Sequence, residues 1–134
     1  MTKVLVFGTF DVLHAGHLSF LKQARQFGEE LKVIVAKDET VKSIKGKKPR
    51  QDENKRLQKV QAIDLVNSAR LGYINQGLKI VEEEEPDVIC LGYDQKNAFE
   101  QKLWQNIYNF SKPISIIRLI PWQQKIYKSS LIKQ

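Results

Sequence analysis

The sequence is poor in the residues that cross-link small proteins. Its 134 residues include one cysteine, Cys90, and two histidines, His14 and His17. One cysteine cannot form an internal disulfide, and this set is too small for a structural zinc site made of cysteine and histidine. A metal ion, if the protein uses one, must therefore be held mainly by oxygen ligands.

Long hydrophobic runs are also missing. No apolar run approaches the roughly 20 residues needed to cross a bilayer, and no basic segment followed by an apolar stretch opens the chain. Hydrophobic residues still make up 42% of the sequence, which is too many for a disordered chain. The length fits one domain, residues 1–134. We expect a cytoplasmic globular domain without a membrane contact.

Basic residues outnumber acidic ones, 22 to 15, which gives a formal net charge of +7. Nine of them fall between Lys37 and Lys59. Such a surplus fits nucleic acid, an acidic membrane surface or a small phosphorylated ligand, and a solvated surface explains any single charge equally well. Nucleic acid is disfavoured, because acids are interspersed among the basic residues and no predicted strand carries a row of aromatic residues for base stacking.

Apolar runs alternate with helical patterns along the chain. Strands buried on both faces are typical of parallel sheets and give near-continuous apolar runs, whereas helices show a three-to-four-residue spacing and capping residues. We predict strands at residues 3–7, 31–36, 69–73, 87–92 and 114–120, and helices at residues 16–27, 52–65, 78–85, 96–110 and 127–133.

This alternation predicts βαβ units with right-handed crossovers. The expected fold is α/β, a single Rossmann-like doubly wound domain with a five-stranded, mostly parallel sheet flanked by helices. In such sheets ligands bind beyond the carboxyl ends of the strands, near the point where the strand order reverses. The loops predicted at that edge are residues 8–16, 37–49, 92–97 and 120–130.

The most informative stretch is Gly8-Thr9-Phe10-Asp11, followed by His14-Ala15-Gly16-His17, where the first strand gives way to a helix. Backbone amides at a helix N-terminus bind phosphate, and imidazoles beside them can donate hydrogen bonds to phosphate oxygens. Gly16 allows a ligand to approach the backbone closely. A metal site would be short of ligands with only two histidines, and a purely structural loop with capping residues is the other alternative.

This stretch resembles the HxGH signature of the nucleotidylyltransferase superfamily, whose members transfer a nucleoside monophosphate from a nucleoside triphosphate and release pyrophosphate. The resemblance to the small cytidylyltransferase-like branch covers nearly the whole chain. Residues 45–49 and 91–95 resemble the archaeal-type FAD synthetases more closely than the glycerol-3-phosphate cytidylyltransferases. The resemblance implies that ATP and FMN give FAD, with CTP and glycerol 3-phosphate as the alternative pair.

The resemblance also implies roles for individual residues. His14, His17 and Lys45 would be catalytic and would stabilise charge on the phosphates. Asp11 and Asp38 would contact the acceptor. The residues implied to bind the nucleotide are Gly8, Thr9, Phe10, Gly16, Arg56, Gly92, Asp94, Ser129 and Ser130.

The C-terminal end departs from the cytidylyltransferase pattern. That branch carries a sequence like Arg-Thr-Glu-Gly-Ile-Ser-Thr-Thr after the last strand, whereas only a hydroxyl pair survives here, at Ser129 and Ser130. The residues that could replace the charge of the missing arginine are Arg118, Lys125 and Lys128.

A flavin acceptor would need an apolar slot for its ring. Trp104, Trp122 and Tyr127 are candidates for lining it, although each fits packing or an interface as well. The resemblance further implies Mg²⁺ held mainly through the nucleotide phosphates, with no protein ligands assigned, and a homodimer. A nucleotide-binding module without turnover is the alternative from another class, and the intact His14 and His17 argue against it.

Overall fold

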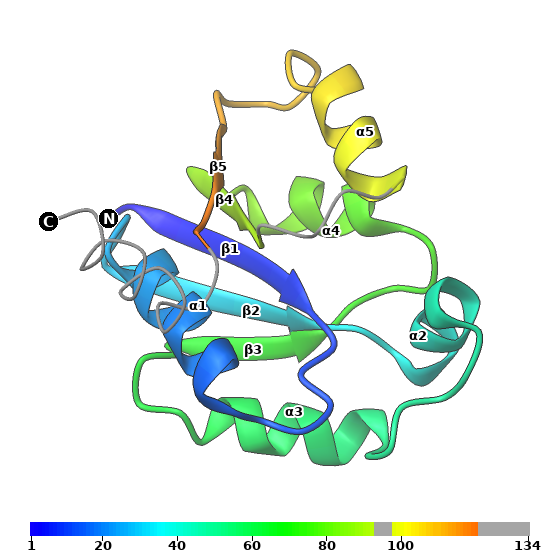
Figure 1. The fold of residues 1–134 in the computed structure, drawn as a ribbon. Helices are drawn as coiled ribbons and strands as arrows, with labels where there is room; N and C mark the ends of the chain where they lie inside the picture. The colour runs from blue at the N-terminus through cyan, green and yellow to red at the C-terminus, as the bar shows by residue number, and fades with distance from the viewer. Residues whose placement is uncertain (93–97, 121–134) are drawn as a thin grey trace, which may run out of the picture.

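The computed structural model describes residues 1–92 and 98–120, which form a β-sheet with helices packed around it (Figure 1). The strand order is β3-β2-β1-β4-β5, and every neighbouring pair of strands is parallel. This confirms the predicted five-stranded α/β fold, with a sheet that is parallel throughout. The strands are β1 (Lys3–Gly8), β2 (Glu30–Val35), β3 (Ser68–Leu71), β4 (Val88–Leu91) and β5 (Ser115–Arg118); the helices are α1 (Ala15–Arg25), α2 (Asp38–Lys45), α3 (Glu53–Gln61), α4 (Gly77–Glu84) and α5 (Ala98–Gln105).

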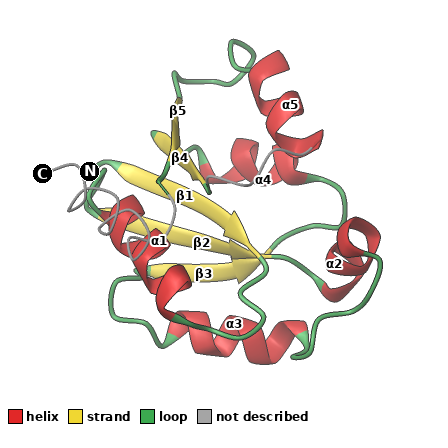
Figure 2. Ribbon diagram, viewed as in Figure 1, coloured by secondary structure: helices red, strands yellow, loops and turns green. Residues whose placement is uncertain are grey.

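Two hydrophobic cores cover the two faces of the sheet, because successive side chains of a strand point to opposite faces. Val4 and Val6 of β1 belong to the core that α1 and α3 complete, and Leu5 between them belongs to the core under α4 and α5. All three side chains are completely buried. The unbroken apolar run at residues 4–7 of β1 is thus explained by helices on both faces, which Figure 2 shows in red against the yellow strands.

The segment expected to be a loop at residues 37–49 contains the helix α2, and this prediction was wrong. Its sequence contains only two apolar residues, Val41 and Ile44, and only Val41 is buried. The helix is favoured instead by charge and capping. Asp38 and Glu39 lie in the first turn, Lys42 and Lys45 lie in the last turn, and Gly46 follows with φ 81°. Acids near the N-terminus and bases near the C-terminus stabilise the helix dipole, and a left-handed glycine ends the helix.

The other elements lie where they were predicted, with shifted ends. Asp52 caps α3 as expected, and its carboxylate accepts a hydrogen bond from the Lys55 amide at 2.8 Å. The helix predicted at residues 96–110 is shorter, because α5 ends at Gln105. The helix predicted at residues 127–133 lies outside the described part of the chain. None of the helices in residues 1–92 and 98–120 has both the length and the apolar content required to cross a membrane.

The strand order reverses beside β1. The chain builds β1, β2 and β3 toward one edge of the sheet and then returns through α4 to place β4 on the other side of β1. Loops that leave the carboxyl ends of β1 and β4 therefore diverge, and the space between them is where ligands bind in sheets of this kind. The loop that carries the two histidines leaves β1 at this place.

A buried ionic cluster stabilises the opposite end of the sheet. The Glu84 carboxylate, at the end of α4, is 2.8 Å from the Lys3 ammonium, 3.0 Å from the Lys32 ammonium and 2.9 Å from the Arg70 guanidinium. Burial alone would raise the pKa of Glu84, but hydrogen bonds from these three cations outweigh burial and lower the pKa to about 2. The carboxylate thus joins α4 to β1, β2 and β3.

We expect Glu84→Gln to lower the free energy of unfolding by about 2–3 kcal/mol at pH 7, because three cations lose their shared anion. The folded pKa lies below the usual value of 4.5, so the stabilisation is complete above pH 4.5 and is lost as the pH falls toward 2. Urea unfolding at pH 7 and at pH 3 measures this. Glu82→Gln, an exposed change on the same helix, is the control and should shift stability little. A difference between wild type and Glu84→Gln that stays constant down to pH 3 would contradict the account.

Candidate active site

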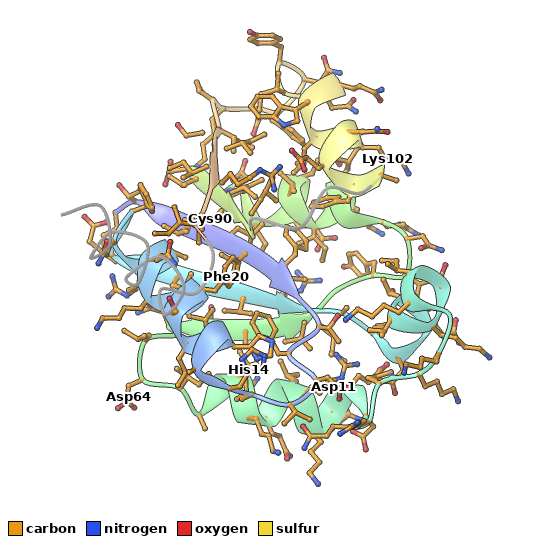
Figure 3. All side chains as sticks on the ribbon, in the orientation of Figure 1. Asp11, His14, Phe20, Asp64, Cys90 and Lys102 are labelled. Atoms are coloured by element: carbon orange, nitrogen blue, oxygen red, sulfur yellow. The ribbon has the colours of Figure 1, made fainter. Side chains whose placement is uncertain are left out.

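The loop between β1 and α1 carries the candidate catalytic residues. It leaves the sheet beside the point where the strand order reverses, and Figure 3 shows His14 and Asp11 along it. His14 is the N-cap of α1, with extended backbone angles (φ −146°, ψ 179°), and Gly16 and His17 lie in the first turn of the helix. The amides of that turn and the two imidazoles therefore lie at the same end of the helix.

The two imidazole rings are stacked and held by the backbone. Their centroids are 3.9 Å apart, with an angle of 26° between the planes. The Nδ1 atom of His14 accepts a hydrogen bond from the Gly16 amide at 3.0 Å, and the Nδ1 atom of His17 accepts one from the His14 amide at 3.3 Å. Because Nδ1 is an acceptor in each ring, the neutral ring carries its proton on Nε2. His14 can then donate from Nε2 to a ligand, whereas a ring N–H of His17 also has the Val12 carbonyl as a hydrogen-bond partner.

The surroundings of His17 keep it neutral. Burial lowers its pKa below the ordinary value of 6.5, and the electrostatic interactions with His14 and Lys45 lower it further, against a backbone hydrogen bond to Val12 that raises it. Lys45, in the last turn of α2, is therefore close enough to act on His17 although it lies 28 positions further along the chain. A neutral donor and a lysine ammonium together suit an anionic ligand.

The ring of Phe10 packs against the ring of His17. It is buried, with its backbone in the left-handed region at φ 53°, and its ring centroid lies 5.4 Å from that of His17. Its ring also lies over Gly8, where an added Cβ would come within 2.6 Å of Phe10 Cε2. Gly8 is therefore required for space.

Gly8→Ala is expected to push the Phe10 ring toward His17 and to cost about 1–3 kcal/mol of stability, as overpacking does. Turnover should fall with it, because the His17 ring would lose its support. Thermal unfolding and steady-state rates measured on the same preparation test this. Gly46→Ala is a useful comparison, since an added Cβ there would meet nothing within 4 Å and only its φ of 81° would oppose the change. A wild-type rate in Gly8→Ala would show that Phe10 does not position His17.

Arg56 forms a buried hub under the site. Its side chain is completely enclosed, and its guanidinium makes four hydrogen bonds. It donates to the carbonyl oxygens of Gln51 at 2.9 Å, Thr9 at 2.8 Å and Ala36 at 2.7 Å, and to the Asp38 carboxylate at 2.7 Å. The structure therefore does not place Arg56 on a surface that faces a nucleotide. It joins the loop after β1, the end of β2, the start of α2 and the segment before α3.

The Asp11 carboxylate also connects the loop after β1 to the segment before α3. Its two carboxylate oxygens accept hydrogen bonds from the backbone amides of Arg50 at 2.8 Å and Gln51 at 2.9 Å. Burial would raise the pKa of Asp11, but these amides and the positive charge of Arg56 outweigh it and keep the pKa below its ordinary value. The ionised carboxylate ties the histidine loop to the chain that follows the basic segment.

Sequence reasoning missed the contact of Glu53. Its carboxylate accepts a hydrogen bond from the Asp38 amide at 2.8 Å, which binds the first turn of α2 to that of α3. No local pattern indicates this contact, because the two residues are 15 positions apart. The carboxylate of Asp38 faces Arg56, so both acidic residues expected to contact the acceptor, Asp11 and Asp38, are engaged within the protein.

The β4 side of the site is described only in part. Gly92 follows β4 directly, and its carbonyl oxygen accepts a hydrogen bond from Arg118 at 2.7 Å. Arg118, at the end of β5, also pairs with Glu100 in α5. The expected nucleotide-binding residues Asp94, Ser129 and Ser130 lie outside the described residues.

The site can bind and polarise phosphate groups. It brings together a helix N-terminus, two imidazole donors and a lysine, all of which favour negative charge. The single cysteine of the sequence, Cys90, is completely buried in β4, and burial raises the pKa of its thiol to about 12. A thiolate nucleophile is thus excluded, and electrostatic stabilisation is the chemistry that these residues supply.

The doubly wound α/β sheet, with phosphate-binding groups at the start of its first helix, has the fold and site of a nucleotidyltransferase, and the comparisons with known proteins support this class. The chain belongs to the cytidylyltransferase-like family, whose model matches residues 5–134.

Several relatives in this family carry the name FAD synthase. The one from Thermoplasma volcanium is 37% identical over 134 residues, covering 100% of this chain and 93% of the relative. The one from Methanohalophilus mahii is 43% identical over 112 residues, covering 81% and 78%. A solved structure from Thermoplasma volcanium, titled a lipopolysaccharide core biosynthesis protein, superposes with a TM-score of 0.82 at 40% identity, covering 89% of this chain and 96% of that one.

Proposed function

We propose that the protein is an adenylyltransferase that makes FAD and pyrophosphate from ATP and FMN. The observation that carries the proposal is the stacked His14–His17 pair at the N-terminus of α1, with both Nδ1 atoms engaged by backbone amides. The substrates follow from the FAD synthases that resemble this chain over most of its length.

The reaction joins two anions, so positioning and charge stabilisation are its main requirements. An oxygen of the FMN phosphate attacks the α-phosphorus of ATP, the bond from that phosphorus to the bridging oxygen of the β-phosphate breaks, and pyrophosphate leaves. His14 and His17 donate from Nε2 to the oxygens on which negative charge grows. Lys45 neutralises the phosphates. No covalent intermediate on the protein is required.

The remaining residues of the proposed site divide into two groups. Arg56, Asp11 and Asp38 position the loops, since their charged groups bind one another or the backbone. We propose nucleotide contacts for Gly8, Thr9, Gly16 and Gly92, and also for Asp94, Ser129 and Ser130, which lie outside the described residues. Phe10, expected to bind the nucleotide, is buried and packs against His17 instead.

Mg²⁺ is proposed as the cofactor. In residues 1–92 and 98–120 no group of three or more histidine, cysteine or acidic side chains could hold a metal ion. The described groups at the site are cations and N–H donors, which suit triphosphate oxygens, and Asp11 and Asp38 are already engaged. The ion would therefore be held mainly by the triphosphate, where it would neutralise charge on the departing pyrophosphate.

The test is to incubate the purified protein with Mg²⁺ and either ATP plus FMN or CTP plus glycerol 3-phosphate. Pyrophosphate is measured, and the product is identified by mass. We expect FAD and pyrophosphate in equal amounts from the first mixture. CDP-glycerol from the second mixture alone would overturn the substrates and keep the class, whereas no product in either would favour a binding module without turnover.

We also propose a cytoplasmic homodimer. The supporting observations are the single cysteine of the sequence and the exposed apolar residues Phe27 and Ile120 beside the edge strand β5. Sedimentation equilibrium should give twice the mass of the chain, and a monomer at micromolar concentration would contradict the dimer.

A further inference from the structure

The end of α2 presents an exposed apolar side chain beside the candidate site. Val41 packs into the protein and is 3% exposed, whereas Ile44, three positions further on the same side of the helix, is 65% exposed. Lys45 follows directly, and its charge acts on His17. Ile44 thus adjoins the group that would neutralise a phosphate.

A second apolar side chain lies on the neighbouring loop. β2 and β3 are adjacent and parallel, so the segments that leave their carboxyl ends start side by side. The segment after β2 leads into α2, and the loop after β3 carries Ile74, which is 39% exposed. In Figure 1 the arrowheads of β2 and β3 point toward α2. Ile44 and Ile74 therefore belong to the same edge of the sheet.

We infer that Ile44, together with Ile74 at the same edge of the sheet, forms the surface on which the flavin ring of the acceptor rests. The inference rests on the proposed function. Phosphate and ring are at opposite ends of FMN, and α2 offers a matching pair, with Lys45 for the phosphate and Ile44 for the ring. The exposed lysines of the following segment, Lys47 and Lys48, suit the anionic acceptor as well.

The topology assigns this surface to the acceptor and leaves the nucleotide elsewhere. α2 follows β2, on the β3 side of β1, whereas the crevice between the diverging loops of β1 and β4 is where sheets of this kind bind a nucleotide. Trp104, a candidate from the sequence for lining the slot, is in the last turn of α5 and is 52% exposed. Trp122 and Tyr127 lie outside the described residues.

The test compares Ile44→Ser with wild type. We expect the Kd for FMN, measured by quenching of flavin fluorescence, and the KM for FMN to rise about 5- to 20-fold, because the ring loses apolar contact. The KM for ATP should not change. The inhibition constant of ribitol 5-phosphate, which keeps the phosphate and lacks the ring, should also not change.

The matched control is Tyr108→Ser, which removes another exposed apolar side chain (97% exposed), located beyond α5 in the segment that leads to β5. It should leave the Kd and KM for FMN at their wild-type values. If the wild type makes FAD and Ile44→Ser binds FMN as tightly as the wild type, the inferred flavin surface is wrong and the proposed function is unaffected. If Ile44→Ser weakens the binding of ribitol 5-phosphate as much as the binding of FMN, Ile44 does not contact the flavin ring. If the wild type makes no FAD, the proposed function itself fails.

Discussion

His14→Asn is expected to lower turnover by about 100- to 1000-fold while the fold remains stable. The Nε2–H of His14 donates to charge that grows during the reaction, and removal of one such donor costs about 2–4 kcal/mol of transition-state stabilisation. Asparagine is a preferred N-cap residue, and its side-chain oxygen can replace Nδ1 as the acceptor for the Gly16 amide. The variant therefore separates catalysis from capping.

His17→Ala should show a loss of similar size. Thermal unfolding of each variant shows whether the fold is retained, and steady-state rates at saturating ATP and FMN give turnover. The two losses should be less than additive when the changes are combined, because the rings are stacked and act on the same phosphates. Turnover within a few-fold of wild type in either single variant would mean that the histidines serve only to cap α1.

Arg56→Met is expected to destabilise the protein by about 3–5 kcal/mol. The change leaves Asp38 without its cation and removes the buried guanidinium donor from three carbonyl oxygens. Without these hydrogen bonds, the loop after β1 should lose its fixed geometry. Urea unfolding measures the stability, and the change in turnover follows on the same samples where the variant folds.

Arg56→Lys keeps the charge, but one ammonium cannot reach all four acceptors. This variant should therefore be more stable than Arg56→Met, and its turnover should still be slower than that of the wild type. Combining Arg56→Met with Asp38→Asn completes a double-mutant cycle. The Asp38 change should cost much less when Arg56 is already absent, because the pair is then broken. Full additivity would show that the two residues do not depend on each other.

Local sequence patterns were sufficient for the sheet and for the histidine loop. Strands buried on both faces give apolar runs such as residues 3–7, and a glycine or a capping residue marks where each element ends. The place of the histidines followed from the same reasoning, since a loop after the first strand must reach the carboxyl edge. The tautomer of the two histidines could not be predicted in this way, because it depends on two backbone contacts.

Local sequence patterns could not predict the buried hub formed by Arg56. Arg56 reads as an exposed charge in a basic region, yet it is completely buried because four acceptors from segments up to 47 positions away meet it. Asp11 binds amides that are 39 and 40 positions away. Such contacts depend on how loops converge at the edge of the sheet, which no local spacing encodes. The missed helix α2 differs, because its end charges and Gly46 were visible signals.

One competition experiment tests the central claim most directly. Wild-type protein and His14→Asn are each incubated with Mg²⁺ and an equimolar mixture of ATP, CTP, FMN and glycerol 3-phosphate, and the products are identified by mass. The account predicts FAD as the main product of the wild type and at least a 100-fold slower rate in His14→Asn. CDP-glycerol as the main product, or FAD formed equally fast by both proteins, would contradict it.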